Sequence, residues 1–81
     1  MLDPKQIETW IGSGLRCEHI AVDGDGHHFQ ALIVSAEFEG LNRVKRQQRV
    51  YQTVLDKLNS GELHAISLKT LTPQEWQATH G

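Results

Sequence analysis

The sequence has little cysteine, few aromatic residues, no long apolar run and no excess of basic charge. Cys17 is the single cysteine among 81 residues, so no disulfide can form within the chain. No apolar stretch approaches the roughly 20 residues that cross a bilayer, and the first ten residues lack the basic start and apolar run of a secretory signal. These absences predict a cytoplasmic protein without a membrane partner.

The charge balance argues against a dedicated nucleic-acid binder. The formal net charge is −2, whereas such proteins usually carry a basic excess that neutralises phosphates. The remaining composition, 38% hydrophobic and 22% charged residues, is typical of a folded globular chain rather than a disordered one. A chain of this length has room for one core, so we predict one domain over residues 1–81.

A first helix is predicted over residues 3–13. Asp3 can cap its first turn, and Pro4 suits the first helical position. Gly12 and Gly14 are expected to end it. Apolar residues at helical spacing predict a buried stripe formed by Ile7, Trp10 and Ile11.

Three strands are predicted by alternation and by strand-forming residues. Residues 17–23 and 28–36 flank the segment 23–26 (DGDG), whose repeated Asp-Gly is a strong hairpin signal. A third strand is predicted over residues 63–70 (LHAISLKT).

The longest predicted helix covers residues 43–58, after a connection at 37–42 and before a stop at 59–61. Six of its residues fall on one face, namely Val44, Gln47, Tyr51, Val54, Leu55 and Leu58. A last short helix follows a capping box in which Thr72 caps the helix and Glu75 lies three positions later.

The element order is therefore helix, strand, strand, helix, strand, helix. A strand–helix–strand unit favours a right-handed crossover between parallel strands, and the hairpin adds an antiparallel one. The order predicts an α+β fold of two layers, in which helices cover one face of a mixed three-stranded sheet.

Several segments together resemble the BolA family, and within it the IbaG-like branch. They are VSAEFEG at residues 34–40, Arg46 and Val50 in the long helix, LHA at 63–65, and KTLTPQEW at 69–76. One departure is Gln47, where most family members have histidine. The similarity covers nearly the whole chain.

The resemblance implies a class II KH-like fold and association with a monothiol glutaredoxin and its glutathione. It also implies a [2Fe–2S] cluster shared with that partner, absent from the isolated chain, and a role in iron–sulfur trafficking and stress response. Some family members are described as DNA-binding regulators. We expect the isolated chain to be a monomer or weak dimer.

Five histidines could supply ligands: His19, His27, His28, His64 and His80. Imidazole binds iron well and replaces cysteine on one iron of some [2Fe–2S] clusters. From the residues alone, His64 is better interpreted as a half-buried, hydrogen-bonded residue at a strand end than as a ligand. The resemblance matches His64 to the family's ligand position, with His28 or His27 in the hairpin as the second ligand. His19 and His80 are expected at the surface.

Two surfaces are candidates for macromolecular contact. The resemblance places the glutaredoxin along residues 64–76, which offer His64, Lys69, Thr70, Thr72 and Pro73. A basic cluster on the long helix could contact DNA or be a solvated face, and it comprises Arg43, Lys45, Arg46 and Arg49.

The sequence contains no other recognisable site. No Gly-x-x-Gly loop for clamping a nucleic-acid backbone is present. Cys17 is interpreted as a small packing residue rather than as a thiolate ligand. No nucleophile–base pattern is found, so we do not expect an enzyme.

Overall fold

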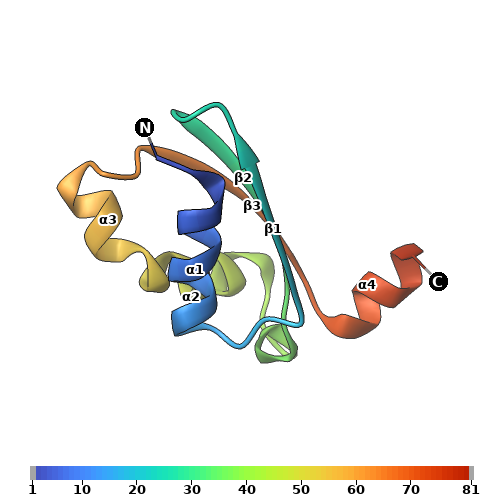
Figure 1. The fold of residues 1–81 in the computed structure, drawn as a ribbon. Helices are drawn as coiled ribbons and strands as arrows, with labels where there is room; N and C mark the ends of the chain where they lie inside the picture. The colour runs from blue at the N-terminus through green and yellow to red at the C-terminus, as the bar shows by residue number, and fades with distance from the viewer. Residues whose placement is uncertain (1, 81) are drawn as a thin grey trace.

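The computed structural model describes residues 2–79 in full and the backbone of His80 (Figure 1). Its elements are α1 (Pro4–Gly14), β1 (His19–Gly24), β2 (His28–Val34), a 3-10 turn (Ala36–Phe38), α2 (Arg43–Thr53), α3 (Leu55–Ser60), β3 (Ala65–Leu71) and α4 (Pro73–His80).

β2 lies at the centre of the three-stranded sheet, whose order is β1-β2-β3. It pairs antiparallel with β1 through the predicted hairpin, and parallel with β3. The register sets His28 beside Ala65 at one end and Val34 beside Leu71 at the other. The predicted α+β fold with a mixed sheet is confirmed.

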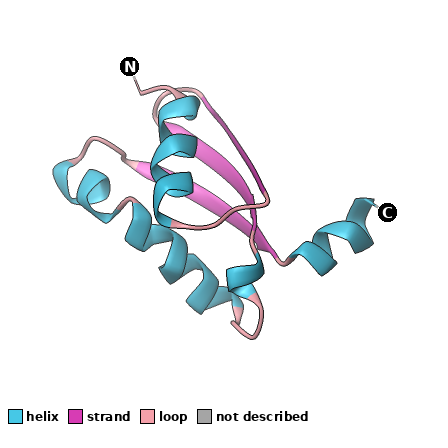
Figure 2. Cartoon of the chain, turned by 60° about the horizontal axis from the view of Figure 1, so that its bottom comes forward, coloured by secondary structure: helices cyan, strands magenta, loops and turns pink. Residues whose placement is uncertain are grey.

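The core forms between one face of the sheet and the helices α1 and α2, with α3 on the same side (Figures 1 and 2). Phe29, Ala31 and Ile33 of β2 alternate toward this face and are buried. The predicted stripe on α1 is confirmed, because Ile7 and Ile11 are fully buried. Other buried members of the core are Leu15, Phe38, Val50, Val54 and Leu63.

α4 stands apart from the other three helices, beyond the end of β3 (Figure 1). Its half-buried Trp76 stacks on His19 at the start of β1, with ring centroids 4.8 Å apart. The predicted arrangement of helices on one face therefore describes α1, α2 and α3, whereas α4 is held by contacts at the sheet end.

The single long helix predicted over residues 43–58 is wrong, because the helix breaks at Val54. Val54 leaves helical geometry at φ −124° and ψ 18°, and the Thr53 hydroxyl bonds the Val50 carbonyl at 2.6 Å. The break keeps Val54 in the core while Leu55 turns outward. The predicted apolar face is also wrong at Val44, which is 63% exposed, and it omitted the fully buried Val50.

Strand and helix ends differ from the predicted ones by a few residues. α1 continues through both glycines to Gly14, and β1 begins at His19 rather than at residue 17. β2 stops at Val34 because the buried Ser35 hydroxyl donates to the Arg16 carbonyl and accepts from the Glu37 N–H. β3 begins at Ala65, so His64 precedes the strand.

The predicted capping box before α4 is confirmed, and its glutamate also pairs with an arginine of α2. The Thr72 hydroxyl accepts from the Glu75 N–H, and Glu75 Oε1 accepts from the Thr72 N–H. The same carboxylate pairs with Arg46 of α2, with Nη1 and Oε1 2.8 Å apart. The Arg46 guanidinium, followed by the Thr72 N–H, lowers the pKa of Glu75 to about 2.

We expect Glu75→Gln to reduce stability above pH 4.5, because glutamine keeps the cap but loses the charge that attracts Arg46. Since the folded pKa is lowered, the wild-type advantage should be complete above the unfolded value of 4.5 and disappear as pH falls toward about 2. Urea unfolding from pH 2 to 7 measures this difference. Glu39→Gln is the control, because Glu39 is exposed and no cation within residues 2–80 pairs with it. A Glu75→Gln penalty independent of pH would contradict the ion pair's role.

Candidate functional site

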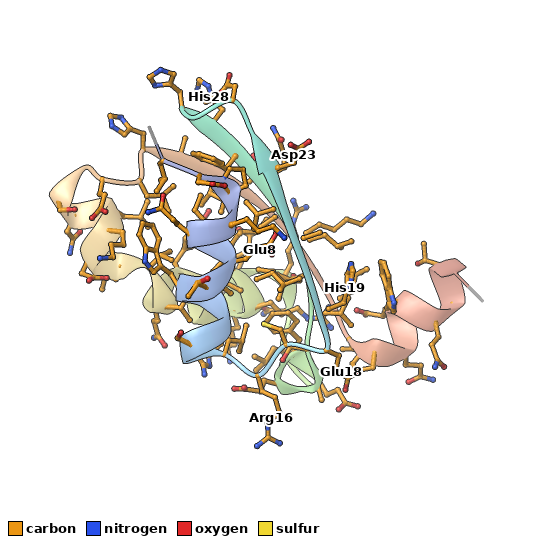
Figure 3. All side chains as sticks on the ribbon, viewed as in Figure 1. Glu8, Arg16, Glu18, His19, Asp23 and His28 are labelled. Atoms are coloured by element: carbon orange, nitrogen blue, oxygen red, sulfur yellow. The ribbon has the colours of Figure 1, made fainter. Side chains whose placement is uncertain are left out.

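The parallel pairing of β2 and β3 gathers three predicted ligand residues at one edge of the sheet. Ala65 is the partner of His28, so His64 lies directly beside the hairpin that carries His27 and His28. Figure 3 shows His28 at this end of the molecule, with His19 toward the other end of β1. We call His27, His28 and His64 the histidine edge.

The hairpin turn fixes the backbone of two of these histidines. Asp25 Oδ1 accepts from the N–H groups of His27 and His28, both at 2.9 Å. These bonds hold the pKa of the Asp25 carboxyl below its ordinary value, and the bond from the His28 N–H has the larger effect. Gly26 completes the turn at φ 99°, a conformation that favours glycine. The loop is therefore a defined turn that presents its side chains to solvent.

All three side chains of the histidine edge are exposed. Within residues 2–80, no hydrogen bond engages their rings, so the half-buried, hydrogen-bonded interpretation of His64 is wrong. The described residues also contain no group of three or more His, Cys, Asp or Glu side chains arranged to hold a metal ion. The donor chemistry suits iron, but the edge can supply only part of a coordination shell and needs a partner to complete it.

Cys17 lies away from this edge, before β1 at the opposite end of the sheet. Its Sγ donates to the Leu15 carbonyl at 3.4 Å. Burial, and secondarily the charge of Glu37, raise the pKa of the thiol. A half-buried, protonated thiol supports the packing interpretation. His19 is exposed as predicted, and the side chain of His80 lies outside the described part of the chain.

The predicted partner-binding residues divide between the two ends of β3. His64 is exposed at the start, whereas Lys69 is exposed about 17 Å farther along the strand. Thr70 is half-buried on the core side, and Thr72 is only 7% exposed because it caps α4. Pro73 is half-buried in the first turn of α4. The residues therefore do not form one compact patch.

The predicted basic cluster is also divided, because two of its members bind within the chain. The Arg46 side chain is 15% exposed and bonds Glu75 and the carbonyls of Leu41 and Thr70. Arg49 pairs with Glu37 at 3.0 Å and reaches a carbonyl at the end of α1. These contacts join segments far apart in the sequence and have no local signal. The remaining members, Arg43 and Lys45, are exposed.

A groove that sequence analysis missed lies between the start of α2 and the end of β3. It encloses about 680 Å³. Its lining residues are Leu41, Asn42, Arg43, Arg46, Leu68, Lys69, Thr70, Leu71 and Glu75. No pattern in the sequence marks it, because its two walls come from segments that only the crossover brings together.

Comparison with known proteins gives a consistent result. The model of the family described as BolA-like protein matches residues 1–75. The chain is 36% identical over 75 residues to acid stress protein IbaG of Escherichia coli K12, covering 93% of this chain and 89% of that one. It is 42% identical to the DNA-binding transcriptional regulator BolA of Haemophilus influenzae, over 89% of this chain and 79% of that one.

A solved structure shares the fold. The BolA homologue from Coxiella burnetii superposes with a TM-score of 0.85 at 37% identity, covering 95% of this chain and 99% of that one. Among residues 2–80, none of the helices has the length and apolar character needed to cross a membrane.

We expect Gly24→Ala to distort the hairpin and displace His28. A Cβ at Gly24 would lie 2.5 Å from the His28 carbonyl oxygen, a backbone atom that cannot move alone. The loss of stability should be about 1–3 kcal/mol, with amide NMR shifts concentrated at residues 24–29. The control is Gly12→Ala, which meets nothing within 4 Å and should stabilise α1 by about 0.5–1 kcal/mol. An unshifted His28 amide in Gly24→Ala would contradict this role of the glycine.

Proposed function

Because the chain belongs to the BolA family, we propose that it is an adaptor for a monothiol glutaredoxin and its glutathione. In this proposal the two proteins share a [2Fe–2S] cluster, and the chain acts in iron–sulfur cluster trafficking and in the stress response. It is an adaptor and not an enzyme. The similarity to an acid stress protein supports the proposed role in the stress response.

The observation that carries the proposal is the exposed histidine edge. A cluster held between two proteins needs ligands at a surface that a partner can approach, and His64 and His28 meet this condition. Their rings form no hydrogen bonds within the described chain, so binding a metal breaks no internal contact. His64 is the principal ligand in this proposal, with His28, or His27 in its place, as the second.

The cluster is the adaptor's cargo, and the chain supplies one side of its coordination. Neutral imidazole can replace thiolate on one iron, which raises the cluster's reduction potential. It also makes the bond sensitive to acid, because protons compete with the metal for the ring nitrogen. Cysteine and glutathione thiolates from the partner would complete the shell. The exposed Lys69 and the half-buried Thr70 and Pro73 would extend the docking surface, with Thr72 holding α4 beneath it.

We expect His64→Ala to abolish the visible spectrum of the mixed complex when glutaredoxin, iron, sulfide and glutathione are supplied. His28→Ala should change the cluster's stability or spectrum while docking persists. His19→Phe is the matched control, because it removes an exposed imidazole at the opposite end of the sheet and keeps an aromatic ring against Trp76. Amide NMR spectra should show an intact fold in each variant. An unchanged spectrum and stability in His64→Ala would refute the ligand assignment.

A second candidate function is DNA binding, and one observation favours it. A relative 42% identical to this chain is a DNA-binding transcriptional regulator, and Arg43 and Lys45 project from α2 into solvent. Against it, Arg46 and Arg49 are engaged by carboxylates, and the net charge is −2. Two free cations offer little of the positive field that attracts a duplex.

We expect duplex binding to be weak, without sequence preference, and to weaken steeply with salt. Replacing Arg43 and Lys45 by alanine should lower the salt slope by about two. Fluorescence anisotropy of labelled duplexes at several salt concentrations measures both effects, with Lys5→Ala as the control. Tight, discriminating binding at physiological salt that requires Arg43 and Lys45 would favour the regulator over the adaptor.

A further inference from the structure

The outer edge of β3 carries no neighbouring strand among residues 2–80. The side chains that donate to carbonyl groups of β3 show which of its backbone groups point toward this edge. Tyr51 donates its hydroxyl to the Ile66 carbonyl, and Arg46 donates to the Thr70 carbonyl at 3.3 Å. In contrast, the Leu71 carbonyl accepts from Ser35 on the inner side. Because strand residues alternate, the backbone carbonyl groups of Ile66, Leu68 and Thr70 point toward the outer edge of the sheet.

This edge is rich in unused hydrogen-bond donors. The N–H and C=O of one strand residue point to the same side, so the N–H groups of Ile66, Leu68 and Thr70 also face outward. No acceptor within residues 2–80 takes any of them, and the Leu68 carbonyl is likewise without a donor. Two of the three outward carbonyls are therefore occupied, while all three N–H groups are available to another chain.

The groove beside this edge is electropositive. Four charged residues line it, namely Arg43, Arg46, Lys69 and Glu75. Arg46 and Glu75 neutralise each other, whereas no carboxylate within residues 2–80 pairs with Arg43 or Lys69. The lining therefore contains two uncompensated basic residues in a chain whose net charge is negative.

We propose that the outer edge of β3 and this groove bind an extended, acidic segment of a partner protein as an added strand. Carbonyl groups of the segment would accept from the outward N–H groups, and its carboxylates would pair with Arg43 and Lys69. Leu41 and Leu68 give the groove apolar contact surface. Strand addition of this kind draws affinity from main-chain bonds and selectivity from flanking side chains.

A peptide fits this groove better than a nucleic acid does. Single-stranded nucleic acids are held by aromatic side chains on which their bases stack, and none of the nine lining residues is aromatic. The donors repeat along a strand edge at every second residue, which is the repeat of another strand's acceptors.

The surface does not include the histidine edge and goes beyond the adaptor function proposed above, although it shares Lys69 and Thr70 with the proposed docking surface. The groove involves residues 68–71 of β3, whereas His64 precedes the other end of the strand. Binding of a free peptide here requires neither a cluster nor a glutaredoxin, so the two proposals can fail separately.

The test uses an acetylated and amidated hexapeptide of alternating glutamate and valine, added to the ¹⁵N-labelled full chain. We expect saturable amide shifts at residues 41–46 and 66–71, with slowed hydrogen exchange at Leu68 and Thr70. A peptide with lysine in place of glutamate should bind far more weakly, and a single-stranded oligonucleotide should not reproduce the slowed exchange.

Charge-reversal variants locate the site. Arg43→Glu and Lys69→Glu should each weaken the acidic peptide roughly tenfold. Lys5→Glu is the matched control for Arg43→Glu, because both residues are exposed in the first turn of a helix. The Lys5→Glu variant should bind the acidic peptide with the affinity of the wild type. His64→Ala should also bind the peptide normally.

Three results would overturn the proposal. The first is that amide shifts are confined to the histidine edge or are absent at millimolar peptide. The second is that the lysine peptide binds as tightly as the glutamate peptide. The third is that only the oligonucleotide slows hydrogen exchange at Leu68 and Thr70. Wild-type affinity in both charge-reversal variants would likewise refute the assigned cations. Amide spectra of each variant before titration confirm the fold, so loss of binding is not mistaken for unfolding.

Discussion

The parallel pairing of β2 with β3 is the constraint on which the other features depend. Parallel strands must begin at the same edge of a sheet, so the chain has to return over the sheet through α2 and α3 before β3 can start. That return places His64 beside the hairpin and its histidines. Within the described residues 2–80, it also leaves the far side of β3 without a strand, next to the start of α2. Both proposed surfaces are consequences of this one pairing.

Arg46 connects the elements that meet around the end of β3. Its guanidinium bonds the Leu41 carbonyl before α2, the Thr70 carbonyl in β3 and the Glu75 carboxylate in α4. A mostly buried arginine needs such acceptors, because an unpaired charge would be costly away from water. The contacts give α4 an attachment to the body, and they remove Arg46 from any role in phosphate binding. A residue in a basic cluster is thus primarily structural.

The elements with local signals were predictable from the sequence, and those set by distant contacts were not. Caps at Asp3 and Thr72 and the Asp-Gly turn are each defined within a few residues, and the structure contains all of them. The break at Val54 was missed because the spacing continues through it, and only packing decides that Leu55 turns outward. The partners of Arg46 and Arg49 are carboxylates from other segments. The histidines of the histidine edge were visible in the sequence as candidate ligands, but their adjacency required the strand order.

The histidine edge and the groove lie toward opposite ends of β3, and this geometry bears on how an adaptor works. β3 is held along its inner edge by β2, and no hinge interrupts it between Ala65 and Leu71. A partner at the histidine edge and a strand added beside Leu68 would therefore keep a fixed relation, because Leu68 lies about 13 Å from His64 along the strand. The cluster ligands are not used by the added strand, whereas Lys69 and Thr70 belong to both proposed surfaces. Cargo held at one end could then be presented to a protein recognised at the other.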